Sequence, residues 1–222
     1  LGYGHRERVG DNPSSVPSDA GTVSIASGSN GVASVVAGEQ HTCAILATGR
    51  VKCWGRGQVG QLGYGNANSI GDDAGEVPST VGFVDVAPDG GVKQLSTRGD
   101  HTCAVLSNGS ARCWGLGSRG RLGYGNTDTI GDTENPSAAG DVRILTGDDA
   151  GVIQVAGGDS HTCALLSNGR VKCWGYNTSG QLGYGNTTTV GDDAGEYPSS
   201  VGFVDFDAGV IQIAAGGFHT CV

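Results

Sequence analysis

The sequence predicts an all-β protein made of β-propeller blades, with about four repeats of roughly 60 residues in a chain of 222 residues. Three observations support this fold class. The tripeptide His-Thr-Cys recurs at 41–43, 101–103, 161–163 and 219–221, so the period is 60, 60 and then 58 residues. Short apolar runs alternate with turns rich in Asn, Gly, Ser and Asp, which is typical of sheets built from short strands. The composition agrees, because the chain contains 42 glycines and no methionine.

Each repeat is expected to contain about four short strands, and the third full copy shows them most clearly. The runs Ala164–Leu166 and Arg170–Trp174 flank the turn Ser167–Gly169, in which Asn-Gly is a strong hairpin signal. The apolar runs Val201–Phe206 and Val210–Ala215 supply the other two strands. Four short strands are the content of a propeller blade, which is stable only when neighbouring blades cover its faces.

The cysteines fit the predicted hairpin. A three-residue turn pairs residue 166 with residue 170, and counting outward from that pair places two cysteines opposite each other on adjacent strands. The pairs expected from this register are Cys43 with Cys53, Cys103 with Cys113, and Cys163 with Cys173. We expect three structural disulfides, each worth about 2–3 kcal/mol, and therefore an oxidising compartment. A metal site or reactive thiols is the alternative, but zinc sites usually pair closer cysteines and each repeat lacks two further ligands.

The predicted repeat boundaries do not divide the chain into whole repeats. They divide the chain into a partial repeat, three repeats and the start of another: 1–40, 41–100, 101–160, 161–218 and 219–222. Cys221 has no partner at the expected spacing, so we expect it to be unpaired or to bond to another chain. By the period, about 17 residues are missing between the last unit and the first. We expect an incomplete ring: either part of a longer array, or a chain that associates with others to complete a propeller or form a fibre.

Two segments of the third repeat resemble a known family. VAGGDSHTCAL (155–165) and WGYNTSGQLGYG (174–185) are similar to the RCC1 repeat, which typically carries G-x-x-H-[ST]-x-A-L and then W-G-x-N-x-x-G-Q-L-G. The resemblance covers essentially the whole chain and implies a propeller, usually of seven blades. The paired cysteines and the acidic Gly-Asp-Asp loop depart from the nuclear members. They resemble bacterial exported and cell-surface repeat proteins.

Two residue types that recur once per repeat are candidates for a ligand-binding role. A ring of imidazoles could line a central channel, but recurrence with the repeat favours structural histidines bonded to backbone: His41, His101, His161 and His219. The tryptophans are expected to pack between blades: Trp54, Trp114 and Trp174.

Two further features suggest specific ligands. The acidic loops could offer oxygen ligands to calcium through Asp72, Asp73, Asp192 and Asp193. Their spacing matches no calcium motif, so we expect solvated acids and no metal. Arg98-Gly99-Asp100 spells an integrin-type adhesion tripeptide, but it lies just before His-Thr-Cys, where a buried blade entry is expected.

Charge and motifs exclude several function classes. The formal net charge of −9, without a basic stretch, makes nucleic acid an unsuitable partner. No apolar run approaches the roughly 20 residues needed to span a bilayer. No set of nucleophile, base and orienting residue appears, and no phosphate-binding loop does either, so we expect neither an enzyme nor a cofactor.

We therefore expect a non-enzymatic extracellular or cell-surface interaction and adhesion module, with the periplasm as another location. Its partner would be a protein or a glycan. Specificity would lie in loops that differ between repeats, such as Arg56–Val59 and Tyr176–Ser179. The alternatives are a structural subunit of a surface fibre or layer, a guanine-nucleotide exchange factor, and an enzyme-inhibiting propeller.

Overall fold

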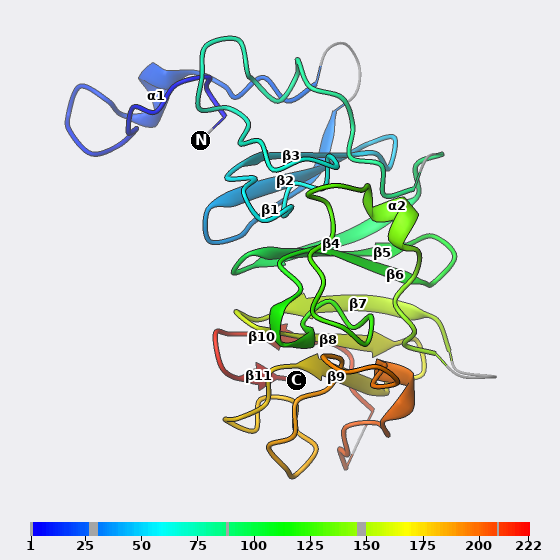
Figure 1. Cartoon of the computed structure of the whole chain (residues 1–222). Helices are drawn as coiled ribbons and strands as arrows, with labels where there is room; N and C mark the ends of the chain where they lie inside the picture. Colours follow the sequence, from blue (N-terminus) through cyan, green and yellow to red (C-terminus); the bar gives the residue numbers. More distant parts are fainter. Residues whose placement is uncertain (1, 27–30, 88, 146–149, 208) are drawn as a thin grey trace.

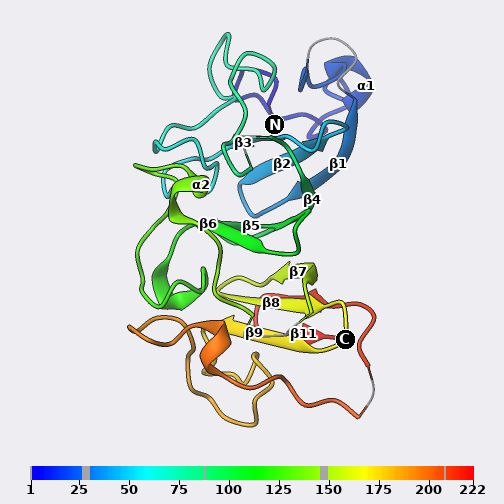
Figure 2. The ribbon, with the colours of Figure 1, turned by 90° about the vertical axis from the view of Figure 1, so that its right-hand side faces the viewer.

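The structure, a computed structural model, describes residues 2–26, 31–87, 89–145, 150–207 and 209–222. It contains three antiparallel three-stranded sheets, which follow one another along the molecule in sequence order (Figures 1 and 2). Their strands are β1 Val32–Ala37, β2 His41–Leu46, β3 Val51–Gly55, β4 Val92–Arg98, β5 His101–Leu106, β6 Ala111–Gly115, β7 Val152–Gly157, β8 His161–Leu166 and β9 Val171–Gly175. The predicted all-β class is confirmed.

A fourth, two-stranded sheet lies beside the third and consists of β10 Ala214–Ala215 and β11 Thr220–Cys221. The helices are single turns: α1 Pro17–Ala20, α2 Pro136–Ala139, and 3-10 turns at Ser118–Gly120 and Pro198–Ser200. No helix in the described segments has the length and apolar character needed to cross a membrane. Leu1, the first residue of the predicted partial repeat, lies outside the described residues.

The hairpin register is the predicted one. Cys163 faces Cys173 across β8 and β9, and the backbone N–H of Leu166 donates to the carbonyl of Arg170 at 2.9 Å. Gly169 closes the turn with a φ of 78°. This left-handed conformation is easy for glycine and strained for other residues, which explains why each hairpin turn ends in Gly.

The fourth predicted strand is not formed. In the run Val201–Phe206, only Val204 reaches the sheet, through an isolated bridge to Val171. Phe203 instead lies under the guanidinium of Arg170, with 3.2 Å between Cζ and the ring centroid. Each of the three large sheets therefore has three strands and one or two isolated bridges, and its first strand precedes the His-Thr-Cys motif.

The core runs continuously through the three sheets, and the end sheets leave apolar side chains uncovered. Leu95 and Val155, at the same position of β4 and β7, are 3% and 1% exposed because the preceding repeat covers them. Val35, their counterpart in β1, is 52% exposed. Ile211 and Phe218 are exposed at the other end of the chain. Burial in this fold thus depends on having a neighbouring repeat, as expected of a repeat array.

Candidate interaction surface

The repeated histidine, threonine and tryptophan bind each repeat to the next. At the junction of the second and third repeats, His101 Nε2 lies 3.0 Å from Thr162 Oγ1. The Thr162 hydroxyl donates to the carbonyl of Arg121 at 2.9 Å, and Trp174 Nε1 donates to the same carbonyl at 3.0 Å. The other junctions have the same contact: His41 with Thr102 at 2.9 Å, and His161 with Thr220 at 3.0 Å. We call this arrangement the histidine–threonine relay.

The relay fixes which ring nitrogen of its histidines carries a hydrogen. A carbonyl oxygen only accepts, so the Thr162 hydroxyl uses its hydrogen on Arg121 and must accept from His101. His101 therefore carries a hydrogen on Nε2, and its lowered pKa keeps it neutral near pH 7. Burial lowers the pKa of His101 to about 3, and burial likewise lowers the pKa values of His41 and His161 to about 4. These imidazoles are structural, as expected, but their partner is a hydroxyl of the next repeat and not a backbone group.

The tryptophans pack between repeats as predicted. A Cβ placed on Gly63 would lie 2.8 Å from Trp114 Nε1, and one on Gly123 would lie 2.7 Å from Trp174 Nε1. Only glycine allows the indole to lie this close to the preceding repeat. Both rings are fully buried and are not available to a ligand.

The structure contains the three expected disulfides: Cys43–Cys53, Cys103–Cys113 and Cys163–Cys173. All six of these cysteines are buried in the core. Cys221 is free and exposed.

The loops that differ between repeats lie at one end of the sheets. They follow β3, β6 and β9 and lie beside the turns that precede His41, His101 and His161. We call this the histidine end, made of residues 38–40, 56–61, 98–100, 116–121, 158–160 and 176–181. The exposed side chains here are not repeated. In the turns before the histidines they are Glu39, Gln40 and Arg98, and in the loops they are Gln58, Arg119, Thr178 and Ser179.

One residue of these variable loops is structural. Asn177 is fully buried, and its amide donates to the carbonyls of Asn186 at 3.0 Å and Thr188 at 2.9 Å. Gly57 and Gly117 occupy the same position in the other loops. The sequence difference between asparagine and glycine at this position therefore changes the internal packing of the loop and not its exposed surface. The part of the loop that can contact a partner is therefore narrower than the sequence suggested.

Ion pairs across the repeats hold the histidine end in place. Arg98 pairs with Asp159 at 3.0 Å, and Arg56 pairs with Asp100 at 3.5 Å. Arg119 lies over the ring of Tyr176, 4.3 Å from its centroid. Both charged residues of the Arg98-Gly99-Asp100 tripeptide are thus used in contacts between neighbouring sheets, and Gly99 is buried. This tripeptide is not presented as an adhesion loop.

The acidic loops do not form a metal centre. Asp72 and Asp73 both pair with Arg6, at 3.0 and 3.5 Å. Burial and the nearby Asp192 and Asp193 raise the pKa of Glu196. Across the described segments, no group of three or more His, Cys, Asp or Glu side chains is arranged to hold a metal ion.

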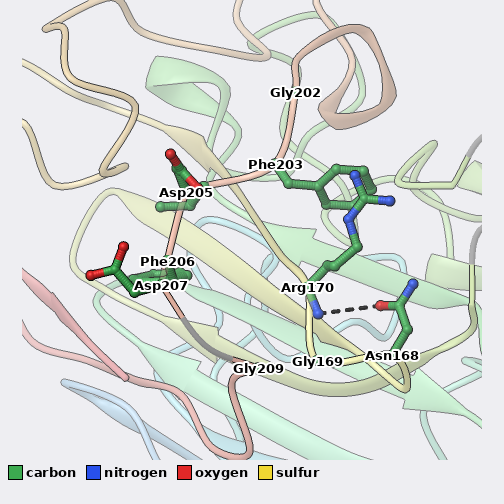
Figure 3. Close-up of a pocket in the computed structure, with 10 residues that line it drawn as sticks. Asn168, Gly169, Arg170, Gly202, Phe203, Asp205, Phe206, Asp207 and Gly209 are labelled. Carbon is green, nitrogen blue, oxygen red and sulfur yellow. Dashed lines mark hydrogen bonds between the residues drawn. The ribbon is translucent and has the colours of Figure 1, made fainter.

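A pocket of about 760 Å³ lies at the outer edge of the last full repeat (Figure 3). Figure 3 shows Arg170 stacked on Phe203, with Asp205, Phe206 and Asp207 along the same chain segment as Phe203. At the equivalent place in the first repeat, Asp85 is covered by the second repeat: Ser137 Oγ donates to its carboxylate at 2.7 Å and Ser137 N to its carbonyl at 2.9 Å. The pocket is therefore the place that a following repeat covers.

A glutamine clamp between repeats was not predicted from the sequence. Gln94 Nε2 donates to the carbonyl of Val155, and Val155 N donates to Gln94 Oε1, both at 2.9 Å. Gln154 makes the same pair of bonds to Ile213, at 2.8 and 2.9 Å. The signal was the recurrence of Gln two positions after a strand-initial valine.

Comparison with known proteins identifies the repeat. A "Regulator of chromosome condensation (RCC1) repeat" profile matches residues 32–61, 92–121 and 152–181, and a second profile with that description matches 108–165 and 168–222. The Arabidopsis thaliana ultraviolet-B receptor UVR8 is 37% identical over 155 residues, which are 69% of this chain and 31% of UVR8. The chain thus spans about a third of that relative.

Two solved structures share the fold. Human WBSCR16 superposes with a TM-score of 0.64 at 19% identity, covering 98% of this chain and 64% of that protein. Yeast RCC1 (Prp20), in a complex with Kap60, superposes with a TM-score of 0.60 at 26% identity, covering 84% of this chain and 40% of that chain. Both matches agree with the stacked sheets described above.

Proposed function

The chain belongs to the regulator of chromosome condensation (RCC1) repeat family, and on this basis we propose that it is a non-enzymatic protein-binding propeller segment whose histidine-end loops hold the partner. The observation that carries the proposal is that the repeated side chains and the variable side chains occupy different places in the structure. The repeated residues are buried and bonded between repeats, whereas the exposed residues of the histidine end differ from repeat to repeat.

The chemistry of the histidine end favours a protein partner over a glycan. The surface offers partly exposed arginines, a half-buried tyrosine and three carboxylates: Arg56, Arg98, Arg119, Tyr176, Glu39, Asp100 and Asp159. Arg and Tyr are enriched in protein interfaces and among the residues that contribute most to their affinity. The ion pairs and the disulfide-linked hairpins hold these groups in place, which lowers the entropy lost on binding. The solved yeast relative is itself bound to a protein, Kap60.

The disulfides support an exported location as part of the proposal. Three disulfides in 222 residues are typical of proteins that fold in oxidising compartments. On this support we propose a location outside the cell, on its surface or in a periplasm, as in the bacterial exported type.

Capture from the native source tests the binding surface. Wild-type protein, a histidine-end variant (Gln58→Ala, Arg119→Ala, Thr178→Ala) and a matched control (Thr48→Ala, Ser107→Ala, Ser167→Ala) are immobilised. Each variant changes one exposed residue per repeat, and the control residues lie in the hairpin turns at the opposite end of the strands. We expect a protein held by wild type and control, with at least roughly tenfold weaker binding to the histidine-end variant. Equal capture by all three, or none by wild type, would overturn the proposal.

A further inference from the structure

Arg119 has a backbone conformation that no other non-glycine residue of the described segments adopts. Its φ is 64° and its ψ is 22°, which lie in the left-handed region. A residue with a side chain is strained in this region, and such strain is concentrated at active sites and ligand clamps. The counterparts of Arg119 in the other two loops, Val59 and Ser179, do not have a positive φ. The strain therefore belongs to this loop alone and not to the repeat.

The side chain of Arg119 reaches the next repeat. Its guanidinium lies over the ring of Tyr176, with 4.3 Å between Cζ and the ring centroid. At the preceding junction the same two sequence positions are occupied by Val59 and Leu116, which are both apolar. Since an apolar pair suffices there, packing between repeats does not by itself require an arginine and a tyrosine here.

Arg119 is exposed and has no carboxylate partner among the described residues. The two aspartates of the histidine end, Asp100 and Asp159, pair with other arginines. Within the described segments, the guanidinium donates one long hydrogen bond, from Nη1 to Ser160 Oγ at 3.4 Å. A guanidinium has five N–H donors in one plane. Stacking on Tyr176 fixes that plane and leaves most of its donors for a ligand.

The charge of the histidine end is opposite in sign to that of the whole chain. Four arginines and three carboxylates give this end a net charge of +1, whereas the chain has a formal net charge of −9. These residues are Arg56, Arg98, Arg119 and Arg121 against Glu39, Asp100 and Asp159. Burial, followed by the charge of Arg119, lowers the pKa of the Arg121 guanidinium, so these two cations are close together. An anion is therefore attracted to this end and meets a guanidinium that has no carboxylate partner.

We propose that Arg119, stacked on Tyr176, is the point at which the histidine end binds a carboxylate in an acidic segment of the partner protein. The planar edge of the guanidinium matches a carboxylate, which accepts two parallel N–H bonds from it. A densely sulfated glycan fits less well, because three carboxylates on the same surface repel a polyanion. This inference rests on the proposed function, since it names the chemistry of the partner that these loops hold.

A titration followed by nuclear magnetic resonance tests the site with a short acidic peptide. The probe is acetyl-Gly-Glu-Glu-Glu-Glu-Gly-amide, and the same peptide with Gln for every Glu is its control. Each arginine of the isotope-labelled protein gives its own Nε–Hε resonance, so Arg119 and the paired Arg98 are followed in one sample. We expect the acidic peptide to shift the Arg119 resonance more than the Arg98 resonance, and the Gln peptide to shift neither.

Two protein variants each remove one positive charge and one stacked guanidinium. Arg119→Gln should bind the acidic peptide at least roughly tenfold more weakly, because a charge-assisted bidentate contact is lost. Arg170→Gln is the matched control, since Arg170 also stacks on an aromatic ring, Phe203, but lies in a hairpin turn at the opposite end of the strands. At physiological salt its distant charge is screened, so the affinity should stay within roughly twofold of wild type. The amide spectrum of each variant shows whether the fold is kept.

Equal loss of affinity in the two variants, or no shift at Arg119, would overturn the proposal. Tighter binding of a heparin tetrasaccharide than of the acidic peptide, lost in Arg119→Gln, would assign the site to a glycan and overturn it as well. The capture experiment gives a separate answer. A partner that is lost from the histidine-end variant but kept by Arg119→Gln would leave the proposed function intact and remove only this inference.

Discussion

His101 and Thr162 lie 61 residues apart in the sequence, yet His101 Nε2 is 3.0 Å from the Thr162 hydroxyl, which in turn binds the Arg121 carbonyl. This contact joins the second repeat to the third through two of the three residues of the His-Thr-Cys motif. The motif is therefore explained by contacts between neighbouring repeats, and its recurrence does not require a ligand.

Removing the relay hydroxyl should weaken the array. Thr162→Val leaves the buried Nε2–H of His101 without an acceptor, so we expect unfolding to require about 1–3 kcal/mol less free energy. Urea unfolding followed by circular dichroism measures the change. Thr42→Val is the matched control, because the described residues include no hydrogen-bond partner for the Thr42 hydroxyl, and it should cost less. Equal losses in the two variants would mean that the relay adds nothing beyond local packing.

Stability should fall as the pH is lowered below 6.5. Burial depresses the pKa values of the relay histidines to about 3 in His101 and about 4 in His41 and His161, against about 6.5 in the unfolded chain. Between these values the unfolded chain binds more protons, so the stabilisation is complete above pH 6.5 and is lost as the pH falls towards 4. Near pH 5 the three histidines together should make the free energy of unfolding change by on the order of 4 kcal/mol per pH unit.

The His101→Gln variant isolates one of these groups. It keeps a side-chain donor for Thr162 but cannot titrate, so the slope of unfolding free energy between pH 5 and 6.5 should fall by roughly a third. Urea titrations at several pH values measure the slope. An unchanged slope would mean that His101 does not become charged on unfolding in this range.

The glutamine clamp allows a stabilising substitution. Gln94 and Gln154 bond the backbone of the next repeat, whereas the first strand of the first sheet, β1, has Ser34 at this position. Ser34→Gln should create the missing clamp to β4 and add roughly 1 kcal/mol to the free energy of unfolding. Ser34→Leu, similar in bulk but without an amide, is the control. Equal stabilisation by both would attribute the effect to apolar contact alone.

The hairpins could be predicted from the sequence because their determinants are local. Ser167, Asn168 and Gly169 specify the turn, and the turn fixes the register that brings Cys163 opposite Cys173. The run Val201–Phe206 was predicted wrongly as a strand, since an apolar run indicates burial but not which group buries it. Phe203 is covered by Arg170, so only Val204 reaches the sheet.

The contacts between repeats could not be predicted because sequence identity does not show which copy supplies each partner. His101 has a threonine next to it in its own repeat, yet it bonds to Thr162 of the following one. Likewise, in the sequence the change from glycine in the other loops to Asn177 is indistinguishable from variation of an exposed residue. The structure shows that the Asn177 amide donates its hydrogen bonds to carbonyls of its own repeat.

The central claim is that disulfide-linked hairpins of an exported protein form these repeats, and counting free thiols in the native protein tests it most directly. Protein from its native source is denatured in excess iodoacetamide, and peptide mass mapping counts the labels on these 222 residues before and after reduction. They contain seven cysteines, of which the structure pairs all but Cys221, so we expect at most one label on them before reduction and seven after it. Seven labels before reduction would contradict both the disulfides and the oxidising compartment.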